Sequence, residues 1–308
     1  MQSRIVVGID GSGPSRSAVH WALARARGTG EGVTLLHVCQ LPAHAAPEAR
    51  NEILQNAAVL AAAEGTFAAG MAPEVDLTTE VLVGTPMVEL SEFSRDAALV
   101  VVGTHKTGFI HGEVYGSQTL RLAASARCPV VTVPEELGRS RQGIVVGVDD
   151  DPAGRAAIDF AAREAQRTGH PLSLIRGCPG SNEVEHHPPF SFESADSESR
   201  AMLGDALAQV RTCCAQVPVR LRVVQRPIAA ALVAASGGAE LTVVGASRGS
   251  GSHGLGSVAH DLLLNIAGPT VVVHAPDAGD SGPQQPSTGR EGTADATSVG
   301  AWTGSHCL

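Results

Sequence analysis

The chain has few aromatic residues and almost no lysine. Phe, Trp and Tyr make up 3% of the 308 residues, and Lys106 is the single lysine. Since hydrophobic residues still reach 43%, the core has to be built from Val, Leu, Ile and Ala. The net charge of −9 argues against a broad basic face. We therefore expect no nucleic-acid partner, because contacts to a phosphate backbone need such a face.

Several signals for other protein classes are also missing. The six cysteines are Cys39, Cys128, Cys178, Cys213, Cys214 and Cys307. They include no CxxC pair, which favours a reducing compartment over a disulfide scaffold. No secretory signal opens the chain, and no apolar run reaches the roughly 18 residues of a membrane helix. The histidines lack the spacing of metal ligands. We expect a cytoplasmic protein with no membrane partner and no metal site.

The clearest positive feature is an internal repeat. The stretch SRIVVGIDGS, which begins at Ser3, returns at Gln142 as QGIVVGVDDD. Two later stretches recur in the same way: LVVVGT at 99–104 with LTVVGA at 241–246, and CPVVTV at 128–133 with GPTVVV at 268–273. The offset stays between 139 and 142 residues, which indicates a duplicated domain.

We divide the chain into three parts on this basis. The first copy takes residues 1–138 and the second takes residues 139–276, each of ordinary domain size and able to bury its own core. Residues 277–308 are rich in Gly, Ser, Thr, Asp and Pro and offer little to bury. We expect this tail to be disordered.

Each copy alternates short apolar runs with helical patterns. Runs such as Ile5–Ile9 and Val33–Val38 predict strands that are buried on both faces. The other strands are expected at 77–83, 99–102 and 130–133, and in the second copy at 144–148, 172–176, 219–224, 241–244 and 270–274. This alternation predicts βαβ units with right-handed crossovers. The fold class is therefore α/β, with two tandem Rossmann-like domains, each a five-stranded parallel sheet with helices on both faces.

An aspartate follows the first strand of each copy, Asp10 in the first and Asp149 in the second. In such sheets ligands lie at the carboxyl ends of the strands, where a carboxylate can accept hydrogen bonds from ribose hydroxyls or an adenine amine. The side chain could equally cap the helix that follows. The sequence leaves both interpretations open, although the repetition suggests a shared role.

The stretch GTHKTGFIHGEVYGS, from Gly103 to Ser117, joins the end of a strand to the start of a helix. Successive backbone amides and a helix N-terminus form an anion site, to which Lys106 could add charge. The alternative is a flexible surface loop before a capped helix. We favour phosphate binding, because the loop meets the sheet at the edge where ligands are expected.

Three better-known motifs do not fit. A Walker A loop ending at Lys106 would need glycine where Val100 and His105 stand. In the segment that starts at Gly11, the third glycine of a dinucleotide fingerprint is replaced by Arg16. GASRG around Ser247 matches a nucleophile elbow in letters, but the required helix does not follow. We therefore predict no catalytic residues.

Both halves resemble the universal stress protein family. The resemblance rests on VVGIDGS at 6–12, VLVGTP at 81–86, VVGTHKTG at 101–108 and GSQTLRLAASARCPVVTV at 116–133, with their second-copy counterparts. It covers nearly all of the chain except the tail. It implies a tandem member with the adenine nucleotide alpha hydrolase-like form of the fold, acting as an ATP-binding stress-response regulator and not as an efficient enzyme. The alternatives are a nucleotide-independent interaction module and a weak nucleotide hydrolase.

The resemblance also implies a set of nucleotide-binding residues. The family spacing is Gly, two residues, Gly, nine residues, then Gly-Ser, and Lys106 replaces the second glycine here. Asp10 would contact the ribose or the base, and Ile9 and Val38 would line the adenine. The full set is Ile9, Asp10, Val38, Val102, Gly103, Lys106, Gly116, Ser117, Gln118 and Thr119, with Asp149, Gly245, Gly256 and Ser257 in the second copy. The ligand would be ATP or another adenine nucleotide, and the sequence does not decide whether Mg²⁺ accompanies it.

The second copy departs further from the family pattern. Only seven residues separate Arg248 from Gly256, two fewer than in the first copy, and Asp151 replaces Ser12. We expect the first copy to bind ATP more tightly, because an added carboxylate repels phosphate. Family resemblance further implies antiparallel pairing of the last strands, Val130–Val133 and Thr270–Val273, with each other or between chains as a homodimer. A regulatory protein partner is expected but not identified.

Overall fold

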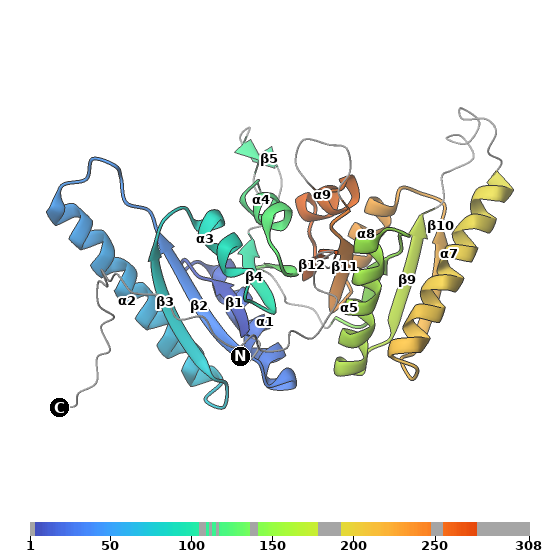
Figure 1. Ribbon diagram of the computed structural model, residues 1–308, viewed down its shortest axis with the longest axis horizontal. Coiled ribbons are helices and arrows are strands. Elements are labelled where there is room, and N and C mark those ends of the chain that lie inside the picture. The colour runs from blue at the N-terminus through green and yellow to red at the C-terminus, as the bar shows by residue number, and fades with distance from the viewer. Residues whose placement is uncertain are drawn as a thin grey trace, which may run out of the picture. The chain divides into compact units, whose positions relative to one another are not determined.

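A computed structural model describes residues 4–104, 109–110, 113–114, 117–135, 141–177, 192–247 and 255–275 (Figure 1). The tail that the sequence predicts to be disordered lies outside these residues. The family-type loop that contains Lys106 and Gly116 is also largely outside them. None of the helices in these ranges is long and apolar enough to span a membrane.

One sheet runs through both copies. The strands of the first half are β1 (Arg4–Gly8), β2 (Gly32–Cys39), β3 (Leu77–Val83), β4 (Leu99–Thr104) and β7 (Val130–Pro134). Those of the second are β8 (Ile144–Gly147), β9 (Leu172–Gly177), β10 (Val219–Val224), β11 (Leu241–Gly245) and β12 (Thr270–Val273). All ten predicted strands are present, with bounds within two residues of the expected ones. A short hairpin, β5 (Phe109–Ile110) with β6 (Glu113–Val114), was not predicted.

The spatial order of the strands is β10-β9-β8-β11-β12-β7-β4-β1-β2-β3. Within each half all neighbours are parallel, which confirms the predicted five-stranded parallel arrangement. The two five-stranded parts are not separate sheets, because β7 and β12 pair antiparallel and join them into one. In each half the first strand lies between the second and the fourth. The chain thus leaves the first strand in one direction and later returns on its other side.

Helices cover both faces of the sheet, as predicted. Their bounds are α1 (Gly13–Thr29), α2 (Pro47–Met71), α3 (Pro86–Phe93), α4 (Ser117–Ser125), α5 (Pro152–Thr168), α7 (Phe192–Cys213), α8 (Ile228–Ser236) and α9 (Ser257–Leu264). Residues of α1, α2, α5 and α7 share one apolar core that continues across both halves. Residues of α3, α4, α8 and α9 pack in two smaller cores. The side chains are mainly Val, Leu, Ile and Ala, as the lack of aromatic residues required.

The helix starts next to the sheet have local causes. The Ser15 amide donates to Ser12 Oγ at 3.3 Å at the start of α1, and the Gly154 amide donates to Asp151 Oδ1 at 2.5 Å at the start of α5. Such side-chain acceptors satisfy amides that a helix leaves without partners. Thr85 precedes α3, but its side chain makes no capping hydrogen bond. There the proline at the first helical position suffices as a start signal.

The last strands of the two copies pair within the chain. Val131 of β7 faces Val271 of β12, and both are fully buried. Directly after β12, His274 Nε2 donates to the Ala123 carbonyl oxygen at 2.8 Å and links the second half to α4. The predicted antiparallel pairing is therefore confirmed in its intramolecular form. It leaves neither strand as an exposed edge.

Candidate functional site

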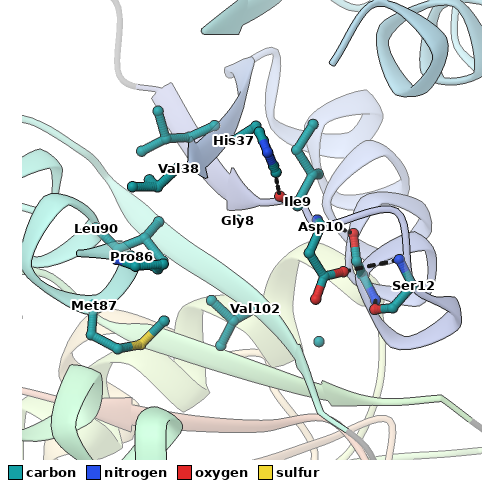
Figure 2. A pocket seen from close by; sticks show the side chains of 13 residues that line it. Gly8, Ile9, Asp10, Ser12, His37, Val38, Pro86, Met87, Leu90 and Val102 are labelled. Atoms are coloured by element: carbon teal, nitrogen blue, oxygen red, sulfur yellow. Dashed lines mark hydrogen bonds between the residues drawn. The ribbon is translucent and has the colours of Figure 1, made fainter. Parts of the chain in front are cut away.

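A pocket of about 190 Å³ opens at the carboxyl ends of the first-half strands (Figure 2). It lies where β1 has β2 on one side and β4 on the other, so neighbouring crossovers diverge there. Ligands of open α/β sheets bind at such a point. The lining residues are Gly8, Ile9, Asp10, Ser12, Ser15, Leu36, His37, Val38, Pro86, Met87, Leu90, Val102 and Gly103. In Figure 2 the side chains of Asp10, Val38, Met87 and Val102 surround the same space.

The Asp10 carboxylate is exposed at this pocket and is held by the backbone that follows it. Its Oδ1 accepts a hydrogen bond from the Ser12 amide at 2.9 Å. The Asp10 amide in turn donates to Ser15 Oγ at 3.2 Å. Since Ser12 caps α1, the alternative role of Asp10 as the helix cap is not what the structure shows. Within the described residues, its second oxygen, Oδ2, has no hydrogen-bond partner and remains available to a ligand.

His37 stands beside Asp10 at the end of β2 and was not foreseen from the sequence. Its Nδ1 lies 2.8 Å from the carbonyl oxygen of Ile9, which can only accept (Figure 2). The ring must therefore carry a proton on Nδ1. When the imidazole is neutral, Nε2 is then a hydrogen-bond acceptor. The pocket thus presents two acceptors, a carboxylate oxygen and a ring nitrogen, above an apolar floor.

Packing requires a glycine at position 103, whether or not a ligand binds. A Cβ atom at this position would lie 2.2 Å from the carbonyl carbon and oxygen of Pro14. In the second half, a Cβ on Gly245 would lie 2.6 Å from the carbonyl carbon of Ala153. Glycine therefore lets the first turn of α1 or α5 pack directly on the fourth strand of its half. This close approach also brings the helix start to the pocket.

The structure brings five of the predicted first-half residues together: Ile9, Asp10, Val38, Val102 and Gly103 all line the pocket. Gln118 is exposed and Thr119 is buried, and neither is among the lining residues. Ser117 opens α4 as predicted, although its side chain lies outside the described part of the chain. Lys106 and Gly116 lie outside it altogether.

Sequence reasoning missed the contribution of α3 to this pocket. Pro86, Met87 and Leu90 form part of its apolar wall. The VLVGTP stretch contained the available signal, since a proline directly after a sheet-edge turn starts a helix beside the ligand edge. His37 could have been found as the neighbour of Val38 on β2, but no pattern distinguished it from an ordinary strand residue.

A second pocket, of about 200 Å³, occupies the equivalent place in the second half. The four residues predicted there line it together: Asp149, Gly245, Gly256 and Ser257. Asp149 Oδ1 accepts from the Asp150 amide at 3.0 Å and from Arg176 Nη1 at 3.2 Å. Unlike Asp10, this carboxylate is therefore paired with a cation of its own chain.

A larger cavity lies elsewhere, at the junction of the halves. It measures about 720 Å³ and is lined by α3 and α4 together with Leu255 and His260 of the second half. The sequence could not reveal it, because it exists only once β7 and β12 have paired. No group of three His, Cys, Asp or Glu side chains suited to a metal ion occurs in the part of the chain that the structure covers.

The apparent nucleophile motif around Ser247 does not assemble a triad with Asp261 and His274, which follow it in the chain order of such a triad. Asp261 lies 3.4 Å from the neighbouring His260 Nδ1. His274 uses Nε2 to hold the Ala123 carbonyl oxygen. Asp261 and His274 therefore make two unrelated structural contacts, and the match to the catalytic motif is one of sequence alone.

Comparison with known proteins agrees with this geometry. The profile of the universal stress protein family matches residues 1–134 and 141–274. Universal stress protein Rv2005c of Mycobacterium tuberculosis is 29% identical over 292 residues, which cover 89% of this chain and 94% of that protein. A universal stress protein structure from Archaeoglobus fulgidus has a TM-score of 0.69 at 16% identity, covering 89% of this chain and 97% of that one.

One solved relative was crystallised with a nucleotide. It is a universal stress protein in complex with cAMP, 21% identical, with a TM-score of 0.37. The match covers 44% of this chain and 99% of that protein.

Proposed function

This chain belongs to the universal stress protein family, with one family domain in each half, and on that premise we propose that it binds an adenine nucleotide in its first half. ATP is the foremost candidate. Binding, and not turnover, would be its means of acting as a stress-response regulator. The domain boundaries we propose are residues 1–138 and 139–276. The observation that carries the proposal is the pair of acceptors, at Asp10 and His37, above an apolar slot at the sheet edge.

The pocket chemistry suits a nucleoside. Ile9, Val38 and Val102 offer apolar surface to a flat base, and Met87 can adapt to its outline. Asp10 Oδ2 and, in the neutral ring, His37 Nε2 accept hydrogen bonds, whereas ribose hydroxyls and the adenine amine donate them. A mostly apolar slot with a few convergent polar groups is the usual form of a small-molecule site.

We place the phosphates at the far end of this pocket, toward Gly103 and the start of α4. Gly116, Ser117, Gln118 and Thr119 would supply backbone and side-chain donors there, and Lys106 would add the one positive charge of the loop. A helix N-terminus with adjacent backbone amides favours an anion through the helix dipole. Asp149, Gly245, Gly256 and Ser257 would form the weaker site of the second half.

The experiment is a calorimetric titration of the full chain with ATP, ADP, AMP, cAMP and GTP. We expect an adenine nucleotide to bind, and Asp10→Asn to weaken it by about tenfold or more, as when a charged hydrogen-bond acceptor is lost. Asp150→Asn is the matched control, since this carboxylate is exposed in the second half and its ion-pair partner among the described residues is Arg155. A wild-type chain that binds none of these ligands would refute the proposal and favour an interaction module without a nucleotide.

Turnover is tested separately by steady-state phosphate release from ATP. We assign the two described acceptors of the pocket, Asp10 and His37, to the nucleoside and not to a water beside the phosphates, so we expect release close to background. Release well above background that disappears in Asp10→Ala would favour the nucleotide hydrolase alternative. The last strands of the two halves, β7 and β12, already pair with each other, so these edges cannot also form a homodimer. A homodimer, if present, would use another surface, and sedimentation of the full chain measures it.

A further inference from the structure

His37 and Arg176 occupy the same position in the two halves. β2 pairs with β1 so that Leu36 faces Gly8, and β9 pairs with β8 so that Ile175 faces Gly147. The next residue along the strand is His37 in one half and Arg176 in the other. Each lies beside the pocket of its own half.

The two side chains make the same backbone contact. His37 Nδ1 donates to the Ile9 carbonyl oxygen at 2.8 Å, and Arg176 Nη1 donates to the Val148 carbonyl oxygen at 2.9 Å. Both carbonyls directly precede the aspartate at the end of the first strand. The local frame is therefore shared, and the pockets differ in what the side chain does beyond that contact.

Arg176 also forms an ion pair with the aspartate of its own half, whereas His37 makes no such contact with Asp10. Arg176 Nη1 lies 3.2 Å from Asp149 Oδ1, and the two side chains are 28% and 56% exposed. Among the described residues no cation holds Asp10 in this way, and its Oδ1 accepts from the Ser12 amide. Arginine has five N–H donors and no acceptor, so at this one position the second pocket presents donors where neutral His37 presents an acceptor.

We propose that the exchange of His37 for Arg176 determines which pocket holds a nucleoside. In the second half the Arg176 guanidinium already engages Asp149 Oδ1, so a ribose hydroxyl or an adenine amine that donates to this carboxylate must compete with the ion pair. The second pocket therefore holds the nucleoside part of the ligand more weakly, and the chain binds one adenine nucleotide. This inference rests on the proposed function, and it identifies the residue that makes nucleotide binding differ between the two halves.

Other differences between the halves must be weighed against this exchange. Size does not explain the asymmetry, because the two cavities measure about 190 and 200 Å³. The carboxylate of Asp151 caps α5 through the Gly154 amide but keeps its charge, so it remains a rival cause, as does the shorter second loop. The test must therefore be made in the first half, where the loop has its full length.

The experiment transfers the arginine to the first half of the full-length chain. We expect His37→Arg to lower the ATP affinity by about tenfold or more, because the new guanidinium engages Asp10 as Arg176 engages Asp149. His37→Gln keeps a donor for the Ile9 carbonyl and an acceptor oxygen for the nucleoside, without a charge, and we expect it to stay within about threefold of wild type. Arg200→Gln, which breaks a surface pair with Asp196 on α7, is the control that should leave this affinity unchanged.

A double variant distinguishes the stated mechanism from a general disturbance. If the arginine acts through Asp10, then His37→Arg with Asp10→Asn binds no more weakly than the weaker single variant, within about threefold. Wild-type affinity in His37→Arg, or a double variant whose losses multiply, overturns the inference while leaving the proposed function intact. A wild-type chain without any nucleotide affinity overturns both. Thermal unfolding checks each variant, and His37→Lys gives the same test if His37→Arg does not fold.

Discussion

Arg25 of α1 and Glu164 of α5 stand at equivalent positions of the two halves and form an ion pair with each other across the junction. Both side chains are largely buried, 11% and 6% exposed. Glu31 lies 3.4 Å from Arg25, and Arg167 lies 2.8 Å from Glu164, so the pair is part of a network of four charges. If two identical halves associated in this way, like charges would meet. The divergence of the repeat at this position thus favours pairing of the two unlike halves.

Removal of Glu164 should destabilise the chain strongly. Glu164→Ala leaves Arg25 in the junction with only Glu31 to balance it, and we expect a loss of about 3 kcal/mol in the free energy of unfolding. Urea denaturation measures this. The control is Glu92→Ala, which breaks the exposed pair with Arg95 and should cost about 1 kcal/mol or less. Equal losses of stability in the two variants would show that the junction pair stabilises the fold no more than the exposed pair does.

Two glycine-to-alanine substitutions should change the free energy of unfolding in opposite directions. Gly103→Ala would place a Cβ 2.2 Å from the Pro14 backbone, so we expect it to lower the free energy of unfolding by about 2 kcal/mol and to weaken nucleotide binding. Gly204→Ala, on the exposed side of α7 with nothing within 4 Å of the new Cβ, should raise stability by about 0.5–1 kcal/mol. Thermal and urea denaturation of both variants test the pair. A neutral Gly103→Ala would contradict the packing role assigned to that glycine.

Filling the apolar slot should block the first pocket. Val38 is half-buried at the end of β2, and Val38→Trp places a large ring where we propose that the adenine lies. We expect nucleotide affinity to fall by about tenfold or more, with little change in the unfolding midpoint. Val59→Trp, at a position on α2 that is 70% exposed, is the matched control. Unchanged affinity in Val38→Trp would place the base elsewhere.

Stability should fall at alkaline pH through Cys128. Burial raises the pKa of this thiol from 9.0 to about 12. Between these two values the folded chain keeps a proton that the unfolded chain releases, so the free energy of unfolding decreases as the pH rises. Between pH 8 and pH 10 the share of this one thiol is a loss of about 1 kcal/mol in the free energy of unfolding.

Urea denaturation of wild type and Cys128→Ala at pH 8 and pH 10 isolates that share. The variant should lose less stability than the wild type over this interval. Burial also raises the pKa of Cys213, to about 11, but this group is present in both proteins and cancels in the comparison. Parallel pH dependences of the two proteins would contradict the assignment.

The repeat, the strands and the sheet edge that holds the pocket could all be predicted from the sequence, because they follow from local patterns. Strand β3, for example, has the predicted bounds, Leu77–Val83, since a run of β-branched residues between two turns is itself the signal. Asp10 and Val38 were found because they end strands that must finish at the same edge. His37 was missed, since its place at the pocket depends on the register between β1 and β2.

The sequence by itself determined that two α/β domains of one family follow each other, because periodicity and repeated motifs are properties of the chain. Only the tertiary structure decided how the two copies differ. Arg176 reaches Asp149 because β9 and β8 bring them together, and Arg25 meets Glu164 because the pairing of β7 with β12 brings α1 and α5 together. These contacts join residues that are 27 and 139 positions apart, and no local pattern reports on a distance in space.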